Sequence, residues 1–210
     1  MIALFGGTFD PVHLGHVAAA EAARQALTVN EVRMVLARQP YHKPLSGGAT
    51  AAQRRDMLIL ACEAHPHLVA DDSELAGDGP SYTVDLLERR ASVDPLERRC
   101  WIIGTDAFAP ILGWRRVDDV FRLSSFLVLR RAGSPPDFGK QLRAFIHPRL
   151  VDRLDQTLHG QVMIVEAGLP DISSSRVRQA IHARENENED PGQWLAPAVC
   201  DYIRKNRLYA

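Results

Sequence analysis

The chain has 210 residues, of which 46% are hydrophobic and 24% charged, and its net charge is −1. This composition is that of an ordinary soluble globular protein, and the length suffices for one full core. A charge so near zero excludes recruitment of nucleic acid by a global positive field. No apolar run approaches the ~20 residues that span a bilayer, and the N-terminus lacks the basic region of a signal peptide. We therefore expect a cytoplasmic protein that binds neither membranes nor nucleic acid.

Short apolar runs, typical of buried strands, alternate along the chain with segments of helical spacing. In chain order, the predicted strands are residues 2–5, 31–37, 67–72, 100–104, 125–130 and 161–166. The predicted helices are residues 16–27, 50–64, 81–90, 173–184 and 197–208. Thr50 and Ser81 are expected to cap the helices that start at them.

This alternation predicts an α/β fold, a Rossmann-like, doubly wound parallel sheet with helices on both faces. From about residue 172 to residue 210 the pattern changes to helices only, which predicts a C-terminal helical extension of a single domain over residues 1–210. Cys62, Cys100 and Cys200 are far apart and form no C-x-x-C pair. We expect three buried or half-buried thiols rather than a disulfide or a zinc site.

The segment FGGTFDPVHLGH, residues 5–16, lies between the first predicted strand and the first predicted helix. In open α/β sheets, ligands bind beyond the carboxyl ends of the strands, which is where this segment lies. Gly6 and Gly7 permit unusual backbone angles and the close approach of a ligand. Thr8 offers a hydroxyl and a backbone N–H. The segment is neither the G-x-G-x-x-G fingerprint nor a Walker loop.

The two histidines of this segment, His13 and His16, are three residues apart at the start of a helix, so their rings can share one face. Gly15 removes a side chain that would obstruct that face. The helix N-terminus adds free N–H groups and the positive end of a dipole, which together predict a compact anion site. Two alternatives stay open on these residues alone. The segment could be a Gly/Pro turn with incidental histidines, or part of a zinc site, although no third ligand of suitable spacing stands out.

Two motifs at opposite ends of the chain resemble those of the nucleotidylyltransferase superfamily. Residues 6–16 resemble its H-x-G-H signature, and ISSSRVR, residues 172–178, resembles its I-S-S-T-x-I-R motif. Ser175 replaces the usual Thr and Val177 the usual Ile, and both replacements keep the side-chain chemistry. Further segments are similar to bacterial nicotinate-nucleotide adenylyltransferases, namely PYHKP (40–44), GPSYTVDLLE (79–88), WIIGTDAFAPILGW (101–114) and YIRKNRLY (202–209). The resemblance therefore covers residues 1–209.

The resemblance implies an enzyme that transfers AMP from ATP to nicotinate mononucleotide in NAD biosynthesis, giving nicotinate adenine dinucleotide and pyrophosphate. The 5′-phosphate of the mononucleotide attacks the α-phosphorus in line, without a covalent intermediate. A phosphate is already a competent nucleophile at neutral pH, so catalysis rests on positioning and on stabilisation of charge. Mg²⁺ is the implied cofactor, held mainly by the ATP phosphates and water. No protein ligand is assigned to the metal.

The resemblance also implies roles for particular residues. The implied catalytic residues are His13, His16, Lys43 and Arg178. Residues implied to bind ATP and its phosphates are Gly6, Gly7, Thr8, Gly15, Gly104, Asp106, Ser174 and Ser175. Residues implied to bind nicotinate mononucleotide are Thr83, Trp114 and Arg115. On the residues alone, the alternative for Lys43 is a solvated surface lysine, where most lysines lie, and the alternative for Trp114 is a core residue, which a Trp more often is. Asp106 is equally a helix cap, and the alternative for Ser173 is that it is only a cap.

The identity of the acceptor stays open between nicotinate mononucleotide, nicotinamide mononucleotide and phosphopantetheine. We expect a preference for the nicotinate acid, with Thr83 and Arg115 as the residues that tell a carboxylate from an amide. The alternative from another class is a nucleotide-binding regulator that has lost catalysis. Such a protein usually carries a broken motif, whereas the sequence here has all four of His13, His16, Lys43 and Arg178. The sequence leaves open whether the chain forms a homo-oligomer.

Overall fold

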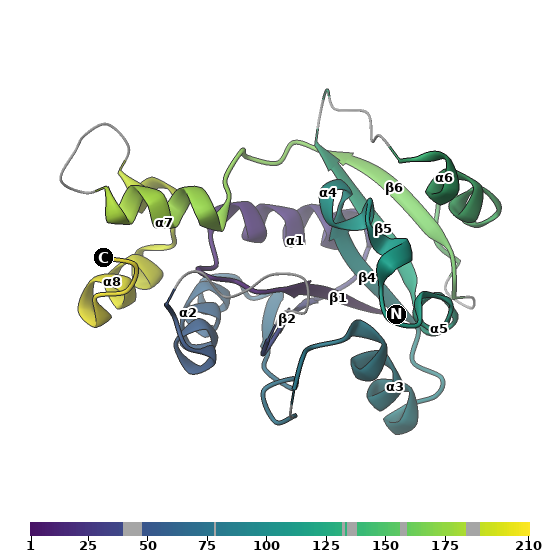
Figure 1. Ribbon diagram of the computed structural model, residues 1–210, viewed down its shortest axis with the longest axis horizontal. Coiled ribbons are helices and arrows are strands. Elements are labelled where there is room, and N and C mark those ends of the chain that lie inside the picture. The colour runs from purple at the N-terminus through teal and green to yellow at the C-terminus, as the bar shows by residue number, and fades with distance from the viewer. Residues whose placement is uncertain (40–47, 78, 132, 134–137, 156–158, 184–189) are drawn as a thin grey trace.

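The computed structural model describes residues 1–39, 48–77, 79–131, 133, 138–155, 159–183 and 190–210. Over these residues the chain forms a six-stranded sheet in the order β3-β2-β1-β4-β5-β6, in which every neighbouring pair is parallel (Figure 1). This strand order is that of the Rossmann fold, so the predicted fold class is confirmed. The strands are β1 (Ile2–Gly7), β2 (Val32–Leu36), β3 (Leu68–Asp71), β4 (Arg99–Gly104), β5 (Ser125–Arg131) and β6 (Val162–Ala167).

The helices include all five that the sequence predicts. They are α1 (Leu14–Leu27), α2 (Ala51–Glu63), α3 (Thr83–Val93), α4 (Thr105–Phe108), α5 (Val117–Leu123), α6 (Lys140–Ile146), α7 (Ser174–His182) and α8 (Pro197–Asn206). The described part of the chain also contains three 3₁₀ turns, which are η1 (Ile111–Gly113), η2 (His147–Arg149) and η3 (Pro191–Trp194). The predicted C-terminal helical extension consists of α7, η3 and α8, and α7 and α8 lie together at one end of the molecule (Figure 1).

Alternate residues of the strands enter two separate hydrophobic cores, one on each face of the sheet. Ala3 of β1 belongs to the core that includes buried residues of α1, α2, α7 and α8. The next residue, Leu4, belongs to the core that includes buried residues of α3, α5 and α6. Cys100 and Trp101 of β4 alternate in the same way. Helices on both faces, as the sequence predicts, explain why the strands are apolar throughout.

The predicted helix caps give one success and one error. Thr50 Oγ1 accepts a hydrogen bond from the backbone N–H of Gln53 at 3.2 Å, so it caps α2 as predicted. The prediction for Ser81 is wrong, because Tyr82 occupies the cap position of α3. Ser81 Oγ instead accepts the backbone N–H of Arg38 at 2.9 Å, and so connects the segment before α3 to the chain just after β2.

The cysteines are free and buried, as predicted. Burial raises the pKa of Cys62 to about 11 and that of Cys100 to about 12. Both thiols are therefore protonated and unreactive at neutral pH. Among the helices of the described ranges, none is both long enough and apolar enough to cross a membrane.

Candidate active site

A cavity of about 360 Å³ lies at the carboxyl edge of the sheet, where β1, β4 and β5 end. The strand order reverses between β1 and β4, so the cavity occupies the topological switch point at which α/β sheets bind ligands. Its walls come from the loop after β1, the start of α4, the end of β5 and the segment that leads into α7. Predicted site residues that line it are Thr8, His13, Gly15, His16, Gly104, Asp106, Ser174, Ser175 and Arg178.

Hydrogen bonds join the two motifs that are far apart in sequence. Ser174 Oγ donates to the backbone carbonyl of Pro11 at 3.0 Å. Arg178 Nη1 donates to the carbonyl of Asp10 at 2.7 Å. Ser173 caps α7 by accepting the backbone N–H of Arg176 at 3.2 Å, as its alternative role predicted. The start of α7 is thereby placed directly against the loop that carries the two histidines.

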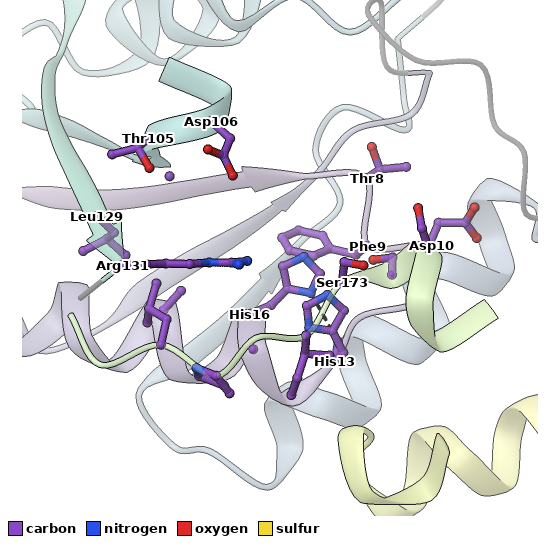
Figure 2. A pocket seen from close by; sticks show the side chains of 18 of the residues that line it. Thr8, Phe9, Asp10, His13, His16, Thr105, Asp106, Leu129, Arg131 and Ser173 are labelled. Atoms are coloured by element: carbon purple, nitrogen blue, oxygen red, sulfur yellow. Dashed lines mark hydrogen bonds between the residues drawn. The ribbon is translucent and has the colours of Figure 1, made fainter. Parts of the chain in front are cut away.

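The imidazole rings of His13 and His16 are stacked, with their centroids 3.7 Å apart and an angle of 25° between their planes (Figure 2). The backbone N–H of His13 donates to His16 Nδ1 at 3.2 Å. A neutral imidazole has one donor and one acceptor nitrogen, so this bond places the His16 proton on Nε2. His16 can therefore donate a hydrogen bond from Nε2 without becoming charged.

Burial keeps both imidazoles neutral. Desolvation, together with the positive charge of Arg131, lowers the pKa of His13 to about 4. Desolvation and the neighbouring His13 lower the pKa of His16 well below its usual value. Removal from water disfavours the charged form of an imidazole, and a second imidazole in contact adds to this effect.

The glycines of the segment have two different physical roles. A Cβ on Gly15 would lie 3.0 Å from His13 Nδ1, so this position keeps the histidine face clear, as predicted. A Cβ on Gly6 would lie 2.3 Å from Trp101 Cζ2, and one on Gly7 would lie 2.7 Å from Phe9 Cε1. Gly6 and Gly7 thus make room for aromatic rings, and neither lines the cavity.

Gly6 and Gly7 do not use the unusual backbone angles that glycine permits, since neither residue has a positive φ. The left-handed conformation is found instead at Phe9, with a φ of 48°. This conformation is uncommon for a residue with a Cβ, and it marks a loop whose shape the surroundings impose. The Phe9 ring packs edge-on against His16, with centroids 5.0 Å apart.

Several cavity residues were not predicted, namely Phe9, Asp10, Thr105, Leu129, Arg131, Leu169, Pro170 and Ile172. Arg131 ends β5 and extends toward the ring of His16 (Figure 2). Its Nη1 lies 2.6 Å from Asp171 Oδ1, so it is part of an ion pair at the cavity rim. A cation at the end of an apolar run can be recognised in the sequence. Only the order of the strands in the sheet, however, places the end of β5 beside β4.

The residues assigned to nicotinate mononucleotide do not line this cavity. Thr83 begins α3, and Trp114 directly follows η1. Arg115 Nη1 lies 3.5 Å from Asp85 Oδ2, and its guanidinium lies 4.6 Å from the centroid of the Tyr82 ring. The structure therefore brings Arg115 to the first turn of α3, where Thr83 lies.

Two further predicted residues have different outcomes. Asp106 lies in the first turn of α4, whose cap position is Gly104, so the alternative role of Asp106 as a cap is wrong. Lys43 lies outside the described residues.

The model of the cytidylyltransferase-like family matches residues 4–180. The match includes the loop after β1, the switch point and most of α7. This chain therefore belongs to the cytidylyltransferase-like family.

Curated relatives that match over the full length narrow the classification within this family. A Chromobacterium violaceum protein described as "Probable nicotinate-nucleotide adenylyltransferase" is 36% identical over 99% of this chain and 98% of its own length. A Stenotrophomonas maltophilia protein of the same description is 38% identical over 98% of this chain and 95% of its own length. These full-length similarities confirm the predicted resemblance to nicotinate-nucleotide adenylyltransferases.

A solved structure shares the fold. It is the Plasmodium falciparum nicotinic acid mononucleotide adenylyltransferase complexed with NaAD, which superposes with a TM-score of 0.74. The match covers 99% of this chain and 96% of that one, at 20% sequence identity. At this identity the likeness supports the fold.

Proposed function

We propose that this chain transfers AMP from ATP to nicotinate mononucleotide, giving nicotinate adenine dinucleotide and pyrophosphate, by direct in-line attack. The full-length relatives support the reaction. The observation that carries the proposal for the site is the joining of residues 8–16 to the start of α7 around one cavity at the switch point. Two helix N-termini, those of α1 and α7, thus contribute to one anion-binding cavity.

The two histidines stabilise charge on the α-phosphate as the bond to pyrophosphate breaks. His16 enters the reaction as a neutral donor through Nε2, because its Nδ1 already accepts the His13 backbone N–H. A bound phosphate favours the protonated imidazole, so binding of ATP opposes the effect of burial on the pKa of His13 and His16. The stacked pair therefore stabilises the negative charge that builds up in the transition state.

The other cavity residues position ATP. Thr8, Ser174 and Ser175 supply hydroxyls and backbone N–H groups to the phosphates. Asp106 accepts hydrogen bonds from the ribose, and Gly104 lets the nucleotide approach the end of β4. A Cβ at Gly104 would meet nothing within 4 Å, which agrees with open space above that residue.

Charge on the leaving pyrophosphate is assigned to two cations. Arg178 lines the cavity, and a guanidinium has five N–H donors, of which one from Nη1 goes to the Asp10 carbonyl. Lys43 keeps the role that the sequence resemblance implies. Gly6, Gly7 and Gly15 shape the phosphate loop through their lack of a side chain.

The nicotinate ring is assigned to the surface between α3 and η1. Trp114 offers an aromatic face for stacking. Thr83, at the N-terminus of α3, offers a hydroxyl and a backbone N–H to the carboxylate. The guanidinium of Arg115 lies beside the same turn and adds a positive charge that favours the acid over the amide.

Mg²⁺ fits this site as an ion held by the triphosphate and water. Within the described ranges, no three or more His, Cys, Asp or Glu side chains are grouped as metal ligands. The carboxylate of Asp106 at the cavity is suited to hydrogen-bond a water of the ion. Mg²⁺ keeps several waters and needs few carboxylates, so a cage of protein ligands is not required. When bound, the ion neutralises charge on the phosphates.

A pyrophosphate-release assay tests the function. Purified protein, ATP and Mg²⁺ are combined with nicotinate mononucleotide, nicotinamide mononucleotide or phosphopantetheine in parallel. We expect the highest kcat/KM with nicotinate mononucleotide. Comparable kcat/KM for the acid and the amide would refute the acid preference, and no release from folded protein with any acceptor would refute the transferase assignment.

A further inference from the structure

The loop from Thr8 to His13 is held by side chains that belong to other elements. Arg54 of α2 donates from Nη1 to the Thr8 carbonyl at 2.8 Å, and its side chain is fully buried. Arg178 and Ser174 of α7 donate to two further carbonyls of this loop, those of Asp10 and Pro11. Loops that carry strained residues keep their shape only when the surroundings determine it, and here the backbone carbonyls are the points of attachment.

The side chain of Asp10 provides a further point of attachment, and its partner comes from the segment after α8. Tyr209 Oη donates to Asp10 Oδ1 at 2.7 Å. Asp10 is only 4% exposed, so its carboxylate depends on protein donors for its hydrogen bonds. Tyr209 follows the end of α8 and is itself in the left-handed region, with a φ of 64°.

This contact is connected to the chemistry through one neighbouring residue. Phe9 precedes Asp10 in the strained part of the loop, and its ring packs against that of His16. A shift of Asp10 therefore moves Phe9, and with it the ring against which His16 is held. Figure 2 shows Thr8, Phe9 and Asp10 following one another along the edge of the cavity, with His16 beneath Phe9.

We propose that Tyr209 is a positioning residue of the transferase site, whose hydroxyl fixes Asp10 and thereby the loop that supports His16. This proposal rests on the proposed function, because its readout is AMP transfer. Tyr209 remains the donor over the whole working pH range, since burial and the charge of Asp10 raise the pKa of its phenol. The aromatic ring packs against the core, so a phenylalanine keeps the packing and removes only the bond.

The test compares two tyrosines of the same C-terminal region. Tyr209→Phe removes the bond to Asp10. Tyr202→Phe is the matched control, because Tyr202 Oη donates to Asp56 Oδ2 at 2.9 Å, between α8 and α2 and outside the cavity. We expect Tyr209→Phe to lower kcat about tenfold or more, since a displacement of ~1 Å in a reacting group costs up to about a hundredfold. The KM for nicotinate mononucleotide should stay within about twofold, because its residues lie on α3 and after η1.

Tyr202→Phe should leave kcat unchanged. All assays are run at a temperature at which thermal melting shows both variants folded. Equal losses in the two variants, or an unchanged kcat in Tyr209→Phe, would overturn the proposal. An inactive wild-type protein would overturn the proposed function as well, so the two failures are distinguishable.

A double-mutant cycle gives a second measurement, which does not depend on a single variant alone. Asp10→Ala removes the carboxylate that accepts the Tyr209 hydroxyl. If Tyr209 acts through Asp10, the kcat of Tyr209→Phe combined with Asp10→Ala should lie close to that of Asp10→Ala alone. Multiplication of the two single effects would mean that Tyr209 acts by another route and would overturn the proposal.

Discussion

The rings of His13 and His16 are stacked, and the backbone N–H of His13 donates a hydrogen bond to Nδ1 of His16. This geometry suits two neutral imidazoles and opposes two charged ones, because like charges at this distance repel in a buried site. Protonation of this pair should therefore destabilise the protein before any anion binds. The effect can be measured on the protein without substrate.

The stability of the substrate-free protein should fall with acidification from pH 6.5 toward pH 5. His13 has a pKa near 4 when folded against a usual value of 6.5, so the unfolded chain binds more protons in this range. Stability is then fully present above pH 6.5 and is lost as the pH falls, by up to about 3 kcal/mol at the end of the transition.

The measurement is urea unfolding at several pH values for the wild type and for His13→Asn. The variant removes the titrating ring, so its curve should be flatter than that of the wild type between pH 6.5 and pH 5. Parallel curves would contradict the assigned cause. Saturating ATP should also reduce the slope in the wild type, since the phosphates favour the protonated ring.

Loss of the His16 ring should remove catalysis while the fold persists. His16→Ala is expected to lower kcat about 10²–10³-fold, as removal of one preorganised donor does in other enzymes. The melting temperature should change little. Steady-state kinetics and thermal melting are measured on the same preparation. Unfolding at the assay temperature would instead mark the ring as a structural residue.

A methyl group at Gly15 should be more harmful than its size suggests. The Cβ of Gly15→Ala would meet His13 Nδ1 at 3.0 Å, so the His13 ring must move by a few tenths of an ångström. We expect this displacement to lower kcat by up to about tenfold. Gly139→Ala is the control, because a Cβ there meets nothing within 4 Å and Gly139 lies at the start of α6. Similar kcat values for the two variants would show that the stack is not required.

Arg115 should determine the preference for the acid. In Arg115→Gln, the ratio of kcat/KM for nicotinate mononucleotide to that for nicotinamide mononucleotide should fall about tenfold to a hundredfold, the value of a hydrogen bond to a charged group. Arg122→Gln changes an exposed arginine of α5 and should leave the ratio as in the wild type. An unchanged ratio in Arg115→Gln would assign the discrimination elsewhere.

The strands and longer helices were predictable because each buries a run of apolar residues long enough to show its period. The helices α4, α5 and α6 were missed because they have only 4, 7 and 7 residues, fewer than a clear helical period needs. Ser81 shows a different limit. A serine before a helix satisfies the rule for caps, yet its hydroxyl is used by Arg38, a contact between residues 43 positions apart.

The site residues also divide into those that a local motif predicts and those that only the tertiary structure places. His13, Gly15 and His16 follow from a local motif, and Arg178 from a second one. Arg131 could not be placed beside them, because its position depends on β5 lying next to β4 in the sheet. The steric requirement for a glycine at position 6 could not be predicted for a similar reason, since the Trp101 ring that imposes it comes from a neighbouring strand.

The loop after β1 has consequences for how the protein is made. Its partners Ser174, Arg178 and Tyr209 lie 163, 168 and 199 residues further along the chain than the groups they bind. A ribosome releases the histidines first and these partners last, so a nascent chain carries both imidazoles long before it can hold their loop in place. Synthesis that stalls partway should therefore leave a fragment that cannot consume ATP, and activity should begin only once α7 and the segment after α8 have emerged.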